Sequence, residues 1–293
     1  MDVLITYVDG NDPLWQEDFS RTVRDAAVTK RYRDMGSFRY LFRALERHLP
    51  FVRKVHLLVA RDSQVPAWIN RDEVHVVTHD AIIPQEHLPV FNSSAIEMFL
   101  HRIPDLDEQF LYFNDDCFPV ADCAPEDFFR DAQVMKGFGT HLIPSGAFRR
   151  LCFRSDRLAR RAAGVRPFLS FLRPQHTCSP MLRSVSEEAF RKMEPAIMQS
   201  LTPLREDTNY NQYFFLDYYL LTGRAVKRRF PAKYFSLAFA KAETIAAAID
   251  DPGGMKMLCI NDARVPADVY DEARDRILAA LERRFPEKSR YEL

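Results

Sequence analysis

The stretch FLYFNDDCF, residues 110–118, joins an apolar run directly to two adjacent carboxylates, Asp115 and Asp116. The run is rich in residues that favour strands, and it predicts a buried strand over residues 109–114. Two neighbouring acidic side chains repel each other, and burial would penalise both. We therefore expect water, a cation, an arginine or a substrate to compensate these charges at the end of the strand.

Three similar apolar runs precede it: VLITYV at residues 3–8, KVHLLVA at 54–60 and VHVVT at 74–78. Apolar residues at helical spacing predict one helix that ends before Pro50 and another that ends before Pro104. Unbroken apolar strands separated by helices are typical of an α/β fold, with a mostly parallel sheet and helices on both faces. Further along, residues 209–223 and 269–285 predict the helices of a helical C-terminal part.

The composition argues against several classes of protein. The 293 residues include 41 basic and 41 acidic side chains, and this balance argues against a dedicated nucleic-acid binder. Five cysteines without a CxxC pair predict neither a disulfide framework nor structural zinc, and reduced thiols fit a cytosol. No run approaches 18 apolar residues, and the N-terminus lacks the features of a signal peptide. We therefore expect a cytoplasmic protein.

The segment 140–175 is locally basic. Two interpretations stay open for it: contact with an anionic membrane surface or a phosphate-rich acceptor, and an ordinary solvated helix face.

Acidic residues follow two of the predicted strands. Asp9 comes after the first strand, and Asp115 and Asp116 come after the fourth. If these strands are neighbours in a parallel sheet, the three side chains share one edge, where such sheets bind ligands. An acidic edge suits Mg²⁺ that carries phosphates, because Mg²⁺ takes one or two carboxylates together with phosphate oxygens and water. The alternative is that these residues only form turns and helix caps.

Longer stretches resemble a known family. These are DVLITYVDGNDPLW, RYRDMGSFRYLFRALERHLPFVRKVHLLVA and HLPVFNSSAIEMFLHRIPDLDEQFLYFNDDCF, then QHTCSPMLRS, REDTNYNQYFFLDYYLLTGR and MLCINDARVP. In this order they resemble the regions of the Stealth family, which includes bacterial capsular polysaccharide phosphotransferases and the catalytic subunit of lysosomal-enzyme N-acetylglucosamine-1-phosphotransferase. The similarity covers most of the chain.

The resemblance implies transfer of a sugar 1-phosphate from a UDP-sugar to a glycan hydroxyl, with release of UMP. It also implies a Rossmann-like, glycosyltransferase-A-like sheet and a requirement for Mg²⁺ or Mn²⁺. On this basis we expect one catalytic domain, residues 1–293. Within it, residues 1–140 would form a nucleotide-binding core, 141–204 a variable and partly helical insertion, and 205–293 a helical part that completes the site.

The family motifs also imply individual roles. Asp116 would be the general base for the acceptor hydroxyl, and Glu97 would orient the acceptor or share that task. His176 would bind the transferred phosphate or serve as acid or base, Arg205 would neutralise phosphate charge, and Asp2 would help hold the donor nucleotide. We further expect metal ligands at Asp115, Asn261 and Asp262, and substrate-binding side chains at Asp9, Arg39, Asn92 and Arg183.

Three positions depart from the family pattern. Tyr7 replaces the usual Trp, Arg183 the usual Lys, and Ala263 the second Asp of the usual CINDD motif. Two other functions therefore stay open: a metal-dependent glycosyltransferase that releases UDP, and a non-catalytic protein that binds sugar nucleotides.

Overall fold

The main sheet of the computed structural model, which describes residues 1–23, 32–262 and 267–293, has the strand order β10-β4-β1-β2-β3. The strands are β10 (Ser179–Leu182), β4 (Gln109–Asn114), β1 (Asp2–Thr6), β2 (Val55–Val59) and β3 (Val74–Thr78). The last four run parallel, and β10 pairs with β4 in the antiparallel sense. All four predicted strands are confirmed, and so is their parallel arrangement.

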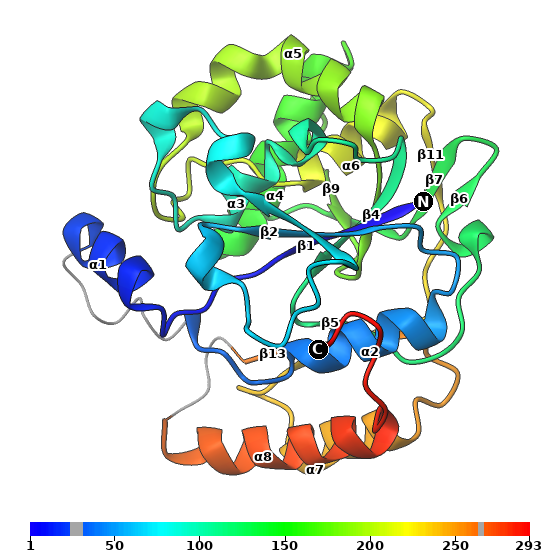
Figure 1. The fold of residues 1–293 in the computed structure, drawn as a ribbon. Helices are drawn as coiled ribbons and strands as arrows, with labels where there is room; N and C mark the ends of the chain where they lie inside the picture. Colours follow the sequence, from blue (N-terminus) through cyan, green and yellow to red (C-terminus); the bar gives the residue numbers. More distant parts are fainter. Residues whose placement is uncertain (24–31, 263–266) are drawn as a thin grey trace.

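Helices cover both faces of this sheet, as predicted (Figure 1). On one face lie α3 (Ser93–Glu97), α4 (Ala147–Ala162), α5 (Arg183–Ser200) and α6 (Tyr213–Leu221). On the other lie α2 (Phe38–His48), α7 (Ala242–Asp250) and α8 (Ala267–Arg284). Strand β1 is sandwiched between these layers, and Val3, Leu4 and Ile5 have no exposed surface. The apolar run therefore forms the centre of the core because both of its faces are covered.

Three small sheets surround the main one. One contains β12 (Ala232–Ser236), β13 (Met257–Asn261) and β5 (Cys117–Pro119), and a second contains β11 (Ala225–Lys227), β7 (Gln133–Lys136) and β6 (Phe129–Arg130). The third pairs β8 (Phe138–His141) with β9 (Phe171–Pro174). The expectation of a helical part over 205–293 was therefore incomplete, because β11, β12 and β13 lie within it. Strands β11 and β13 pair with β7 and β5 from the first half of the chain, and β12 pairs with β13.

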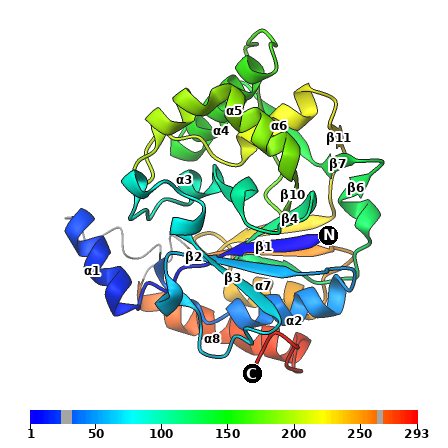
Figure 2. The ribbon, with the colours of Figure 1, turned by 45° about the horizontal axis from the view of Figure 1, so that its top comes forward.

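The helices differ from their predictions in three places, because one predicted helix is split and neither α1 (Pro13–Thr22) nor α7 was predicted. The stripe over residues 96–103 is split between α3 and a one-turn 3₁₀ helix at Leu100–Arg102. Helix α1 projects from one side of the molecule (Figure 2). Its N-cap is Asp12, whose carboxylate accepts the Leu14 N–H at 2.8 Å. None of the helices in the described part of the chain combines the length and apolar character needed to cross a membrane.

Candidate active site

The carboxyl ends of β1 and β4 lie side by side at the centre of the main sheet, where Thr6 pairs with Asn114. In the sheet, β1 lies between β2, which follows it in the chain, and β4. The chain order reverses between β1 and β4, and open α/β sheets bind ligands at such a switch point. The predicted common edge of Asp9 and the Asp115–Asp116 pair is therefore present.

The loop that carries Asp9 is rigid. The Gln64 side chain accepts the Asp9 N–H at 2.9 Å and donates to the Asp9 carbonyl at 2.9 Å. A side chain at Gly10 would meet the Tyr32 carbonyl oxygen at 2.1 Å, so the sequence needs glycine there. The Asp9 carboxylate accepts the Asn11 N–H at 2.8 Å. These hydrogen bonds hold residues 9–11 in place beside the end of β1.

Strand β13 brings residues distant in sequence to the same place. It pairs with β5 so that Cys259 stands opposite Cys117, and the Ile260 N–H donates to the Asp116 carbonyl at 2.8 Å. The chain after β13 therefore emerges beside Asp115 and Asp116, which places Asn261 and Asp262 at this edge. Ala263 lies outside the described residues, so its effect on the motif stays open.

Asp116 is surrounded by hydrogen-bond donors. The thiols of Cys117 and Cys259 lie 3.3 Å and 3.2 Å from its two carboxylate oxygens, and His176 Nε2 lies 3.7 Å from one of them. Burial acts to raise the pKa of Asp116, but His176 and the two thiols overcome it and hold the pKa below its usual value. Asp116 is therefore an anion that can accept a proton.

Asp115 has a different environment. Loss of hydration and the negative charges of Asp116, Asp262 and Asp34 raise the pKa of Asp115 to about 7. The side chain keeps an exposed face, so a ligand can reach it. We call these four acidic residues the carboxylate cluster. Their oxygen atoms suit Mg²⁺ or Mn²⁺, and the repulsion between them is what a divalent cation would relieve. The predicted ligands Asp115, Asn261 and Asp262 lie at this edge of the sheet, and their role as metal ligands stays a prediction.

Glu97, at the end of α3, is buried against Tyr112 of β4. Its carboxylate accepts the Gln212 N–H at 3.0 Å and the Tyr112 hydroxyl at 3.4 Å. Burial raises the pKa of Glu97, and the Gln212 N–H, Arg205 and His176 offset this shift only in part. Glu97 is thus close to two of the other predicted catalytic residues, as the motifs implied.

His176 is held in place by a buried lysine. Lys136 Nζ donates to the Thr177 hydroxyl at 2.9 Å and to the Cys178 carbonyl at 2.7 Å, directly after His176. The Tyr213 hydroxyl lies 3.5 Å from His176 Nδ1. No sequence pattern distinguishes Lys136, because a buried ammonium with oxygen partners is a feature that only the structure shows.

Asn92 is a correction to the prediction. Its side chain is buried, accepts the Ser94 N–H at 3.0 Å, and donates to Asn209 Oδ1 at 2.9 Å and to the carbonyls of Thr202 and Leu204. Both polar atoms of the side chain therefore already have hydrogen-bond partners within the protein. Asn92 instead ties the start of α3 to the loop of Arg205, whose guanidinium donates to the Ser93 hydroxyl.

This role predicts the behaviour of Asn92→Ala. Unpaired partners in a buried site and the lost helix cap should lower the free energy of unfolding by about 2–3 kcal/mol. Chemical denaturation measures this change. Asn11→Ala, at an exposed position on the Asp9 loop, is the control and should change stability by less than about 0.5 kcal/mol. Normal stability with weakened donor binding would support the original substrate-binding role.

Asp2 and Arg183 lie at the opposite edge of the sheet. Asp2 pairs with Phe110 at the start of β4, and its buried carboxylate accepts from Arg53 at 2.7 Å and lies 3.1 Å from His56 Nε2. Arg183 follows Leu182, which pairs with Gln109, also at the start of β4. The strand direction thus separates both residues from the carboxylate cluster. Direct contact with a donor at that cluster is not compatible with these positions.

Asp9 and Arg39 share a cavity of about 370 Å³ with Asp34 and Trp68. The Arg39 guanidinium lies 5.5 Å from the Trp68 ring centroid. Tyr7 links this cavity to the carboxylate cluster, because its hydroxyl donates to Asp34 at 3.2 Å. Its phenol therefore supplies a hydrogen-bond donor at the position where the family usually has Trp. Asp34 was missed because no strand precedes it in the sequence.

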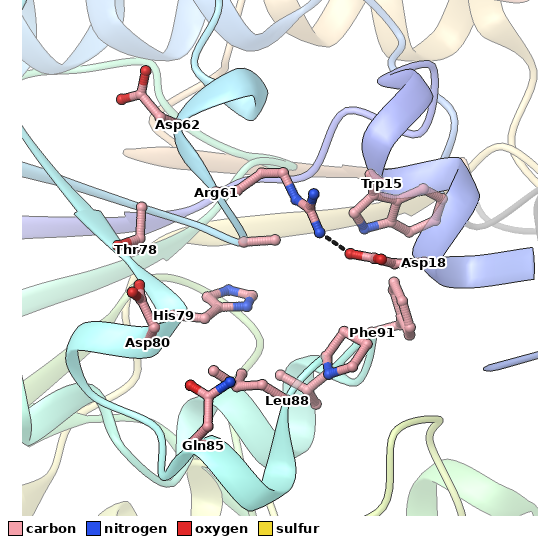
Figure 3. Close-up of a pocket in the computed structure, with 13 residues that line it drawn as sticks. Trp15, Asp18, Arg61, Asp62, Thr78, His79, Asp80, Gln85, Leu88 and Phe91 are labelled. Carbon is pink, nitrogen blue, oxygen red and sulfur yellow. Dashed lines mark ion pairs between the residues drawn. The ribbon is translucent and has the colours of Figure 1, made fainter. Parts of the chain in front are cut away.

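A larger cavity of about 430 Å³ lies beyond β2 and β3 (Figure 3). Three of its charged side chains are in ion pairs, because Arg61 pairs with Asp18 (Figure 3) and Asp62 pairs with Arg71, while Asp80 also lines the cavity. Trp15 and Phe91 at its wall are buried against each other, with ring centroids 5.3 Å apart. None of the four acidic residues of the carboxylate cluster lines this cavity. This cavity is therefore separate from the carboxylate cluster.

Comparison with known proteins agrees with the sequence motifs. Residues 31–137 match the pattern of Stealth protein CR2, conserved region 2. The capsular polysaccharide phosphotransferase WcwK of Streptococcus pneumoniae is 30% identical, over 100% of this chain and 99% of that protein. The exopolysaccharide phosphotransferase cps2G of Lactiplantibacillus plantarum is 28% identical, over 100% and 96%.

Similarity to solved structures is weaker. A complex of the galactosyltransferase LgtC with donor and acceptor sugar analogs covers 97% of this chain and 96% of its own, with a TM-score of 0.45 and 11% identity.

Proposed function

The chain belongs to the Stealth family, and we propose that this phosphotransferase moves hexose- or N-acetylhexosamine-1-phosphate from a UDP-sugar to a glycan hydroxyl, releasing UMP. The relatives named above are capsular and exopolysaccharide phosphotransferases, and we propose the same setting for this chain. The observation that carries the proposal is Asp116, an anionic carboxylate beside His176 at the switch point of the sheet.

The reaction follows from the bond that breaks. An acceptor hydroxyl attacks the β-phosphorus of the donor, the P–O–P bridge breaks, and UMP leaves as a phosphate that needs no proton. Asp116 accepts the hydroxyl proton, a task that an ordinary carboxylate can perform in phosphoryl transfer. Because the bond between the sugar and its phosphate stays intact, the anomeric configuration is retained.

Other residues would bind and orient the substrates. Glu97 lies beneath the site and would orient the acceptor, while His176 and Arg205 would contact the transferred phosphate. Asp115, Asn261 and Asp262 would hold Mg²⁺ or Mn²⁺. Such an ion supplies positive charge to the phosphate oxygens.

The cavity of Asp9, Arg39 and Trp68 supports a place for the donor nucleoside, because an aromatic ring and polar side chains line it next to the carboxylate cluster. This position supports our proposal that residues 1–140 bind the nucleotide within a single catalytic domain. A cytoplasmic location and peripheral membrane association stay predictions.

Product analysis tests the proposal. The protein is incubated with Mg²⁺, a panel of UDP-sugars and hydroxyl acceptors, and the released nucleotide is identified by anion-exchange chromatography. UMP is the expected product, and UDP would support the glycosyltransferase alternative. Donor binding by calorimetry without either product, across the whole acceptor panel, would support a binding protein.

Arg205 provides a sharper test. Arg205→Ala should lower kcat/KM for the donor by about 10–100-fold, because the phosphate loses a cation. Arg183→Ala is the matched control, since its arginine is also exposed but lies at the opposite edge of the sheet. If both substitutions lowered kcat/KM equally, the assignment of Arg205 to the active site and of Arg183 to the opposite edge of the sheet would be wrong. The measurement is initial rate against donor concentration for both variants.

A further inference from the structure

Four side chains with metal-binding atoms converge at Asp116. The thiols of Cys117 and Cys259, one carboxylate oxygen of Asp116 and one ring nitrogen of His176 all lie within 4.8 Å of one another. We call these four residues the thiol cluster. Asp116 and Cys117 are consecutive at the start of β5, His176 lies between β9 and β10, and Cys259 lies in β13, so the fold assembles the group from three separate segments.

The spacing suits a tetrahedral ion. Bonds of 2.3 Å to sulfur and about 2.0–2.1 Å to nitrogen or oxygen separate the ligands of zinc by about 3.3–3.8 Å. In the thiol cluster, the two sulfur atoms lie 3.3 Å and 3.2 Å from Asp116 oxygens, and His176 Nε2 lies 3.7 Å from Asp116 Oδ2. Cys259 and His176 face the same Asp116 oxygen and Cys117 faces the other, and the four ligand atoms all lie within 4.8 Å of one another. The separations from Asp116 are close to the edges of such a site, and an ion bound between the ligands would draw the more distant ones together.

The surroundings hold the ligands in place and leave an entry path. Cys117 and Cys259 are directly opposed on paired strands and buried. Lys136 fixes the chain after His176. The side chains of His176 and Asp116 keep 26% and 19% of their surface exposed, so an ion enters from the active-site side. The expectation that zinc is absent relied on a CxxC spacing, and strand pairing brings the cysteines together without one.

We propose that the thiol cluster is a second metal site, which binds a thiophilic divalent cation such as Zn²⁺ and thereby stops the transfer reaction. Binding replaces the two thiol protons, which are released to solvent, by two metal–sulfur bonds. Sulfur and imidazole ligands favour Zn²⁺ over Mg²⁺, whereas the oxygen ligands of Asp115, Asn261 and Asp262 favour Mg²⁺. The bound ion occupies Asp116 and His176, so neither can take a proton or contact a phosphate.

Cobalt provides a direct measure of binding without any substrate. Co²⁺ titrated into the purified reduced protein should bind one equivalent per chain, with thiolate charge-transfer absorption and the visible bands of a tetrahedral ion. Zn²⁺ should then displace it. Cys117→Ser and Cys259→Ser should each reduce the charge-transfer absorption and weaken Zn²⁺ binding by at least about 100-fold, more than is typical for loss of an outer-shell partner.

Cys123→Ser is the matched control, because this thiol is also buried but donates to the Ala121 carbonyl away from the cluster. It should bind Co²⁺ like the wild type. Absence of thiolate absorption in the wild type, or undiminished absorption in the Cys117→Ser, Cys259→Ser double variant, would overturn the site. These outcomes are separate from the proposed reaction, since no turnover is measured.

The inhibitory part rests on the proposed function and has its own readout. Zn²⁺ added in the presence of excess Mg²⁺ should stop release of UMP, and a zinc-selective chelator should restore it. Residual turnover of the double variant should be insensitive to the same Zn²⁺ concentration. Inhibition that persists equally in the double variant would assign the effect to the carboxylate cluster and contradict inhibition through the thiol cluster.

Discussion

Asp116→Asn is expected to lower the rate of sugar-phosphate transfer by about 10²–10⁴-fold, the range for loss of a positioned base. The amide can still accept a hydrogen bond from one thiol, but it cannot take the proton of the acceptor hydroxyl. The loss should therefore appear in kcat, with little change in the KM for the donor. Release of UMP under saturating donor and acceptor measures it.

Two controls make this result specific. Asp72→Asn, at an exposed position away from the site, should have wild-type kinetics. Circular dichroism and thermal unfolding should show that Asp116→Asn folds normally. A folded Asp116→Asn variant with wild-type turnover would remove Asp116 from the role of base. A rise in KM with unchanged kcat would instead indicate that Asp116 only binds the donor.

The main sheet could be predicted because each of its parallel strands has a recognisable apolar pattern in the local sequence. VLITYV and QFLYFN are buried on both faces, so their apolar character is continuous, and helices between them require parallel crossovers. The pairing of β5 with β13 could not be predicted in this way. Both strands are short, and more than a hundred residues of sequence separate one from the other. Such pairs depend on tertiary contacts that no local pattern encodes.

The same distinction applies to the site. Asp115 and Asp116 directly follow a recognisable strand, so the local sequence is enough to indicate them. His176 and Arg205 were identified by resemblance alone, and the structure brings both near Glu97. Resemblance also selected Asn92, yet it could not distinguish a side chain that contacts substrate from one that holds a loop. That distinction depends on how many hydrogen-bonding atoms remain free.

The second large effect concerns the metal. Asp115→Asn should reduce Mg²⁺-supported transfer by about 10²-fold or more, because one anionic oxygen ligand becomes a neutral amide. The half-saturating Mg²⁺ concentration should rise at the same time. Rates of UMP release across a Mg²⁺ titration separate these two quantities. Chelation with EDTA should abolish transfer by the wild type, and added Mg²⁺ or Mn²⁺ should restore it.

Thermal unfolding tests the same ligand without any turnover. Mg²⁺ that binds the folded protein should raise the Tm of the wild type, and Asp115→Asn should reduce that shift. Without metal, the substitution should stabilise the protein slightly at pH 8. The raised pKa of Asp115 means that its charge is disfavoured in the folded state, so stability falls as pH rises from about 4 to 7. The introduced amide carries no charge, so the substitution removes the repulsion that Asp116 and Asp262 exert on the Asp115 carboxylate. An unchanged Mg²⁺ shift in Asp115→Asn, with wild-type activity, would show that the ion is held by other residues.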